Sequence, residues 1–176
     1  MRTLHVRVER QCRTALALAE YLHKKKEDAE REAGGDDDDL ANTWLARVTV
    51  KAIHYPGLPS HPQHNVATRQ MVLASTPTTG DAIAIPTYGG VLSLELSDAV
   101  EATAFAAALR ISQRATSLGG TETLIEHRAS VEPPDSVVSP PGLLRVSVGL
   151  EDPNDLIRDF EQAFAIVEEV LTEAKH

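Results

Sequence analysis

The segment Leu143-Leu144-Arg145-Val146-Ser147-Val148-Gly149-Leu150 alternates between apolar and polar side chains over most of its length. This period of two is typical of a β-strand with one buried face. The apolar residues at 144, 146 and 148 share that face, and Arg145 lies with Ser147 on the other. An arginine is unusual in so apolar a strand. The sequence alone leaves two roles open for it, a structural ion pair and a contact with an anionic ligand.

The residues after this strand predict a helix. Asp152 is a capping residue, Pro153 suits the first helical position, and Asp155 places an acid in the first turn. The apolar stripe that follows at helical spacing consists of Leu156, Phe160, Ala163, Val167 and Val170. The end of the chain therefore predicts a strand followed by an amphipathic helix.

Patterns of the same kinds predict the elements nearer the N-terminus. Strands are expected at 48–53, with Val48, Val50 and Ala52 on one face, and at 91–96, with a short extended piece at 82–85. Helices are expected over about 2–26, 62–71 and 98–111, the last beginning at Asp98 with Glu101 as in a capping box. Three or four strands separated by helices, without regular βαβ spacing, predict one α+β domain over 1–176, a small sheet covered by helices.

The first expected helix has an apolar stripe and a basic side. The stripe consists of Leu4, Val8, Cys12, Ala15, Ala19 and Leu22. Arginines at positions 2, 7, 10 and 13 lie largely off it, which favours a solvated or partner-facing surface over a membrane-surface helix. Because Cys12 falls on the stripe, we expect it to be a core residue and not a nucleophile.

Composition excludes several classes of function. The chain has 176 residues and a net charge of −9, which argues against a nucleic-acid partner or a general anionic-membrane binder. A single cysteine cannot form an internal disulfide and suits a reducing compartment. No apolar run is long enough to span a membrane, and residues 1–5 lack the apolar core of a signal peptide. These features predict a soluble, cytoplasmic protein.

Charged residues dominate the stretch 24–44, most densely from Lys24 to Asp39. Because it has little apolar surface to bury, we expect it to be a mobile surface insertion. The four aspartates at 36–39 lack the spaced ligands of a calcium loop, so no metal role is expected.

The seven histidines do not predict a metal site. His61 and His64 are three residues apart and His54 is near, but three prolines interrupt the segment and no cysteine or carboxylate pair stands at ligand spacing. We therefore expect these histidines to cap helices or lie in loops. The sequence also lacks a nucleophile-elbow motif and a Walker-type phosphate loop.

Two segments together resemble a known family. They are Ser117-Leu118-Gly119-Gly120-Thr121-Glu122-Thr123-Leu124-Ile125-Glu126-His127 and Leu143-Leu144-Arg145-Val146-Ser147-Val148-Gly149-Leu150-Glu151-Asp152. They look like the C-terminal half of the Cys/Met-metabolism pyridoxal-phosphate enzymes, which include cystathionine γ-synthase, cystathionine β- and γ-lyases and methionine γ-lyase. Tyr55-Pro56-Gly57-Leu58-Pro59-Ser60-His61-Pro62 and Gly89-Gly90-Val91-Leu92-Ser93-Leu94-Glu95-Leu96 resemble two other family segments in the expected order. The resemblance implies a mainly antiparallel sheet covered by helices, as in the C-terminal domain of fold-type I enzymes.

The resemblance also implies roles for four residues. The family arginine that grips the substrate α-carboxylate falls on Arg145. The family serine near the cofactor lysine and substrate falls on Ser117, with Leu118 beside it. The position before that serine, which varies with reaction preference, is Thr116. On this basis Arg145 is expected to matter for ligand binding more than for folding, and no catalytic residue is expected within this chain.

The departure from the family is as informative as the likeness. The family's cofactor lysine stands in a Ser-x-Thr-Lys context that none of the lysines here shares, so the pyridoxal-phosphate-binding domain is expected to be absent. The implied function is the substrate-carboxylate-binding domain of a C–S lyase or γ-replacement enzyme acting on sulfur amino acids, inactive alone. The expected partners are the missing N-terminal half or a full-length homologue, in a homo-oligomer that is a tetramer in the family. The alternative is a non-catalytic truncated homologue that serves as an oligomerisation or binding module.

Overall fold

The computed structural model describes residues 2–33, 50–74 and 84–173. The helices and strands in chain order are α1 (Leu4–Ala33), β1 (Val50–His54), α2 (His64–Gln70), β2 (Val72–Ala74), β3 (Ala84–Pro86), β4 (Val91–Leu96), α3 (Ala99–Ala108), β5 (Gln113–Arg114), β6 (Leu124–His127), α4 (Arg128–Val131), the 3₁₀ turn η3 (Pro134–Ser136), β7 (Leu143–Ser147) and α5 (Pro153–Glu173).

The main sheet has five strands in the order β1-β4-β7-β6-β5. Its first four strands are antiparallel to their neighbours, and only the short edge strand β5 runs parallel to β6. Strands β2 and β3 form a separate antiparallel pair. The α+β fold with a mainly antiparallel sheet is therefore confirmed.

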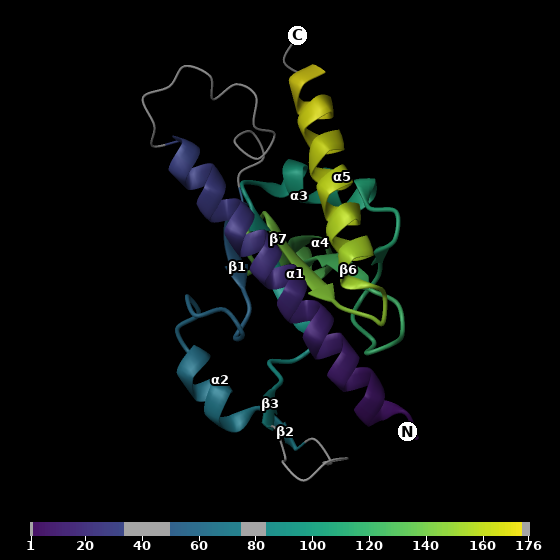
Figure 1. The fold of residues 1–176 in the computed structure, drawn as a ribbon. Helices are drawn as coiled ribbons and strands as arrows, with labels where there is room; N and C mark the ends of the chain where they lie inside the picture. The colour runs from purple at the N-terminus through teal and green to yellow at the C-terminus, as the bar shows by residue number, and fades with distance from the viewer. Residues whose placement is uncertain (1, 34–49, 75–83, 174–176) are drawn as a thin grey trace.

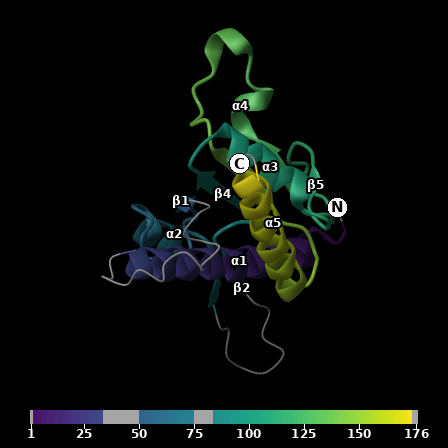
Figure 2. The same ribbon diagram turned by 90° about the horizontal axis from the view of Figure 1, so that it is seen from above.

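The two faces of the main sheet differ in chemistry. Leu94 pairs with Leu144, and Val146 lies between Leu92 and Ile125; all five side chains are buried on one face. Helices α1 and α3 pack against this face, and α5 packs on both of them (Figure 1). Helix α3 packs on α5 through contacts of Phe105 with Phe160 and Phe164. Figure 2 shows α1 and the short helix α4 on opposite sides of the molecule. The second face carries a polar row across four strands, made of His54, Ser93, Arg145 and Glu126.

Both capped helices begin where the sequence predicts. The Asp98 carboxylate accepts the backbone N–H groups of Val100 and Glu101, and Asp152 accepts that of Asn154. Four residues of the α5 stripe are fully buried, but Val170, the last, is half exposed. Helix α3 ends at Ala108 rather than near Ile111. The physical reason is that the backbone N–H groups of residues 110–112 donate to the Asp159 carboxylate instead of to α3 carbonyls.

Helix α1 differs most from the prediction, because it continues through the charged stretch to Ala33. Residues 24–33, expected to begin a mobile insertion, are helical. Lysine, glutamate and alanine are strong helix formers, and the i,i+4 pairs His23–Glu27 and Lys26–Glu30 connect successive turns. The rest of that expectation, residues 34–44, lies outside the described residues. On the stripe, Cys12 is buried as expected, and burial raises the pKa of its thiol, whereas Leu4 is exposed.

Strand β1 contains a bulge that changes which residues face the core. Val50 pairs with Leu96, and after the irregularity Ile53 pairs with Leu94. Ile53, and not Ala52, therefore joins Val50 on the apolar face, where it packs against the core. The extra residue of a bulge reverses the alternation that the sequence alone indicates.

Candidate functional site

Arg145 lies in the middle of β7 on the polar face, opposite the apolar face that contains Leu144 and Val146. Its Nη2 donates to the Glu126 carboxylate, which β6 holds directly across the strand pair. The Arg145 side chain remains 30% exposed. Its Nε is buried and has no hydrogen-bond partner among the described residues. The guanidinium is thus fixed at one nitrogen and open at its Nη1 side.

Glu126 is the buried centre of this polar cluster. Only 4% of its side chain is exposed, and its second oxygen accepts a hydrogen bond from Arg128 Nη1 at 2.8 Å. Arg128 is the first residue of α4, directly after β6. One carboxylate therefore lies between two guanidiniums, one from β7 and one from α4.

Glu132 continues the cluster away from Arg145. Its carboxylate lies 3.4 Å from Arg128 Nη2. It also accepts the Ser139 hydroxyl and the backbone N–H groups of Val138 and Ser139, at 2.8 and 3.1 Å. These hydrogen bonds, more than Arg128, lower the pKa of Glu132 to about 2. The acid fixes the chain after α4 and remains ionised at neutral pH.

The loop after β5 carries the other three expected site residues, Thr116, Ser117 and Leu118. Leu118 is 81% exposed, Thr116 is exposed and Ser117 is half-buried. Within the described part of the chain, no hydrogen bond or ion pair joins any of them to Arg145. The structure therefore places them on one loop without bringing them into polar contact with the arginine.

Contacts from distant elements hold this loop. The Gln11 side chain of α1 donates to Gly120 O at 2.7 Å, and Gly119 adopts a positive φ of 62°, which favours glycine. After the loop, the Glu151 carboxylate accepts the N–H and the hydroxyl of Thr123 at 2.7 and 2.6 Å. The loop is thus positioned from α1 and from the segment between β7 and α5.

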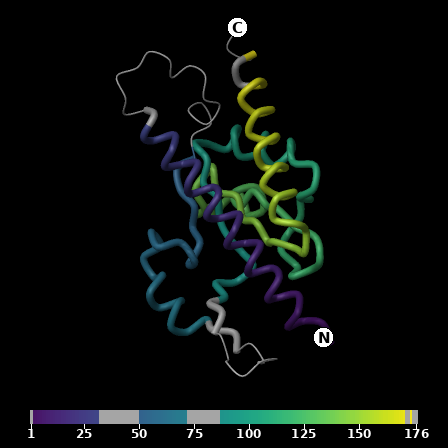
Figure 3. The backbone as a smooth tube through the Cα atoms, in the orientation of Figure 1, coloured from purple at the N-terminus to yellow at the C-terminus, as the bar shows by residue number. Residues whose placement is uncertain are grey.

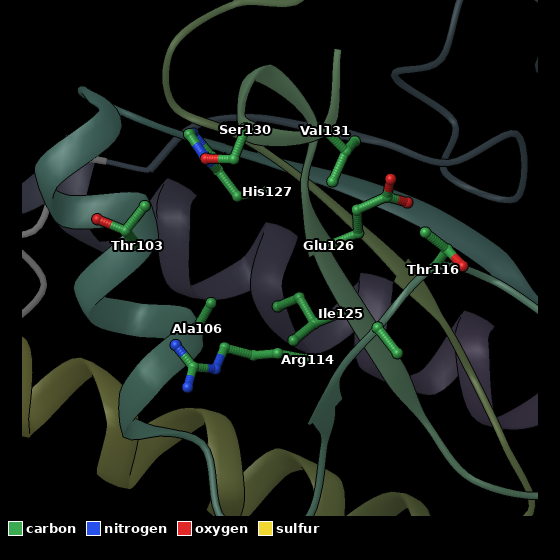
Figure 4. A pocket seen from close by; sticks show the side chains of 10 residues that line it. Thr103, Ala106, Arg114, Thr116, Ile125, Glu126, His127, Ser130 and Val131 are labelled. Atoms are coloured by element: carbon green, nitrogen blue, oxygen red, sulfur yellow. The ribbon is translucent and has the colours of Figure 1, made fainter. Parts of the chain in front are cut away.

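A pocket of about 320 Å³ lies between α3, α4 and the β5–β6 edge of the sheet (Figure 4). Thr116 and Glu126 both line it, so it connects the loop with the polar cluster. Arg114 also lines it, and no described residue forms a hydrogen bond or ion pair with its guanidinium. The volume is within the range of small-molecule sites.

The lysines among the described residues lie away from the Arg145 cluster. Lys24, Lys25 and Lys26 lie on α1, and Lys51 on β1 donates to Ser97 O at 2.6 Å. None of these lysines belongs to the cluster around Arg145. No group of potential metal ligands is present in the described ranges either. His64 Nδ1 lies 2.8 Å from Pro56 O, and both ring nitrogens of His127 have hydrogen-bond partners, Ser130 Oγ and Pro141 O.

Comparison with known proteins supports the resemblance seen in the sequence. A family model described as "Cys/Met metabolism PLP-dependent enzyme" matches residues 1–165. The chain belongs to this family. Its members depend on pyridoxal phosphate, as the family's description states.

The similar proteins are considerably longer than this chain. An L-methionine gamma-lyase of Fusobacterium nucleatum is 31% identical over 92% of this chain and 34% of its own length. A cystathionine beta-lyase of Coxiella burnetii is 33% identical over 93% of this chain and 35% of its own length. The crystal structure of metB from Corynebacterium glutamicum matches with a TM-score of 0.60 and 28% identity, over 93% of this chain and 34% of the other. The chain thus spans about a third of the length of these relatives.

Sequence reasoning missed the two partners in the Arg145 cluster. Glu126 stands inside the family-like segment, and its alternation with Ile125 would place it on the polar face. That it lies opposite Arg145 depends on the β6–β7 register, which no local pattern reveals. The ion pair gives Arg145 a structural contact as well, because it balances a buried carboxylate; the expected role of Arg145 in ligand binding stays a prediction.

Proposed function

We propose that this chain is the substrate-carboxylate-binding domain of a pyridoxal-phosphate-dependent enzyme that acts on sulfur amino acids. The observation that carries the proposal is the placement of Arg145 on the open polar face, where no described residue bonds to the Nη1 side of its guanidinium. The family membership indicates the class of chemistry, a C–S lyase or a γ-replacement. The residues that hold the cofactor would come from chain outside this sequence.

Arg145 would bind the amino acid through its α-carboxylate. A guanidinium presents N–H donors in a planar fork that matches a carboxylate. Glu126 takes one Nη2 donor, so an Nη1 donor and the second Nη2 donor would form this fork. Holding the carboxylate fixes the orientation of the bonds at Cα, and this orientation is the main contribution that a binding domain can make to the reaction. Each charge-assisted hydrogen bond of this kind contributes about 1.5–3 kcal/mol.

The loop after β5 would form the wall next to the bound amino acid. In this proposal Ser117 and Leu118 contact the substrate, and Thr116 influences which reaction is preferred. Thr116 lines the same pocket as Glu126, which supports this assignment for Thr116. The exposure of Leu118 supports it as well, because an exposed large apolar residue suits a surface that another part of the protein covers.

The proposal requires a partner that supplies the cofactor. This partner is the N-terminal part of the same enzyme or a full-length homologue, within a homo-oligomer such as a tetramer in the cytoplasm. Exposed apolar residues at the start of α1, Leu4 and Val6, are compatible with such a contact. No helix in the described residues is long and apolar enough to cross a membrane.

A chimera tests the proposal directly. This chain would replace the corresponding third of the Corynebacterium glutamicum protein, and turnover of a sulfur amino acid would be measured for the chimera and for the chain alone. We expect turnover by the chimera only, and no visible absorbance from lysine-bound pyridoxal phosphate in the isolated chain. Turnover by the isolated chain would contradict the proposal. A folded chimera with bound cofactor but no turnover would favour the non-catalytic binding module.

A further inference from the structure

We infer that Glu126 and Arg128 act as positioning residues for Arg145: Glu126 fixes the guanidinium, and Arg128 keeps it able to bind a carboxylate. The inference rests on the proposed function and adds two residues to it. Neither belongs to the expected site residues 116–118 and 145.

Arginine has a long side chain with considerable rotamer freedom. Binding by a mobile guanidinium is weaker, because the side chain loses conformational entropy when it is ordered. Glu126 comes from the neighbouring strand in direct register, is almost fully buried and contacts only Nη2. It therefore restrains one end of the guanidinium while the Nη1 side stays open.

A carboxylate that served Arg145 alone would cancel its charge and could occupy two of its donors. In the structure, the second Glu126 oxygen binds Arg128 Nη1 at 2.8 Å, so each oxygen serves one guanidinium. Arg145, Glu126 and Arg128 together carry one net positive charge, and the ionised Glu132, which contacts only Arg128 of these three, balances it. Glu132 contacts Arg128 at the opposite end of the cluster and has its own hydrogen bonds to Ser139 and Val138.

The direction in which KM changes in Glu126→Gln distinguishes an effect of charge from a loss of positioning. Removing the negative charge makes the cluster more positive, so an effect of charge alone would lower KM for an amino-acid substrate. A loss of positioning would raise KM instead. In the chimera described above, we expect Glu126→Gln to raise KM by about tenfold, the size expected from one weakened charge-assisted hydrogen bond, while kcat changes less than about twofold.

Arg128 supplies a second pair of variants in case Glu126→Gln does not fold. Arg128→Met leaves Glu126 free to neutralise Arg145 and should raise KM. Arg128→Lys keeps the charge and should leave KM near that of the unmodified protein. Equal KM values for the two variants would overturn the inference, as would an unchanged or lowered KM in Glu126→Gln.

Two controls separate this inference from its alternatives. Glu101→Gln changes another buried carboxylate, which lies on α3 and accepts the backbone N–H of Ser97 at 3.4 Å, and should lower stability without changing KM. Arg145→Lys tests the proposed function itself: normal KM there would contradict the carboxylate site, whatever Glu126 does. In NMR spectra of the isolated chain, the Arg145 Nη groups should give separate resonances, because Glu126 restrains the guanidinium. In Glu126→Gln these resonances should merge. Unchanged Nη resonances would overturn the positioning role even if the chimera were inactive.

Discussion

Asp159, which lies outside the polar cluster, determines where α3 ends and how the chain continues. It is buried on α5, and its carboxylate accepts three consecutive backbone N–H groups, from residues 110–112, at 2.8, 3.0 and 3.1 Å. This contact ends α3 and directs the chain toward β5 and the loop with Thr116. A buried polar group that serves several donors is costly to replace, because each donor loses a charged acceptor.

We therefore expect Asp159→Asn to lower the free energy of unfolding by about 2–3 kcal/mol. For a chain of this length the melting temperature would fall by roughly 4–12 °C. Thermal unfolding followed by circular dichroism measures this change. Asp155→Asn, an exposed acid on the same helix, is the matched control and should change the melting temperature little. Equal effects of the two substitutions would show that the turn after α3 does not depend on Asp159.

Glu132 predicts a specific dependence of stability on pH. Hydrogen bonds from Ser139 and Val138 lower its pKa in the folded chain from 4.5 to about 2. A carboxylate with a lowered folded pKa stabilises the protein above its unfolded pKa, and this contribution is lost as pH falls through the folded value. The loss due to Glu132 should therefore occur between about pH 4.5 and 2. As pH falls through this interval, the melting temperature of the unmodified chain should approach that of Glu132→Gln. A difference that stays constant from pH 6 to pH 2 would contradict the assignment.

At the scale of elements, the sequence predicts what local patterns encode. The starts of α3 and α5 depend on the side chains of Asp98 and Asp152, and the strands β4 and β7 on strict alternation, so all four are predicted correctly. The bulge in β1 and the early end of α3 depend on partners distant in sequence. For the same reason Arg145 could be identified as a candidate from its strand, whereas its pairing with Glu126 required the register of the sheet.

The charged half of α1 is the element whose behaviour differs most from expectation. Its mixed charges suggest a segment with nothing to bury, yet Ala29 packs against the core and ion pairs connect its turns. If residues 24–33 are helical in solution, glycine should be costly there. We expect Glu27→Gly to lower the free energy of unfolding by about 1 kcal/mol relative to Glu27→Ala, a difference of roughly 2–4 °C in melting temperature.

Glu27→Ala is the matched control because it removes the same pairing with His23 without the backbone cost of glycine. Thermal unfolding of both variants supplies the measurement. Identical melting temperatures would indicate that this stretch does not contribute helix to the folded state.

At the scale of the whole molecule, the sheet separates folding from binding. One face is closed by α1, α3 and α5 and contains the leucine-rich core (Figure 3 shows the path of the chain around it). The other face carries His54, Ser93, Arg145 and Glu126 in one row across four strands. The relatives are about three times as long as this chain, so they contain further residues that could cover such a face. A domain built in this way is expected to bind one part of a substrate and to leave the reaction to the rest of the enzyme.

The central claim is that Arg145 binds a substrate carboxylate through its planar fork. The most direct measurement is kcat/KM of the chimera with Arg145→Lys, together with its melting temperature. Lysine keeps a positive charge beside Glu126, so the protein should still fold, but a point charge cannot reproduce a bidentate contact. We predict that kcat/KM falls by at least about tenfold while the melting temperature changes by less than about 4 °C. A folded Arg145→Lys protein with undiminished kcat/KM would contradict the claim and leave Arg145 as a structural partner of Glu126.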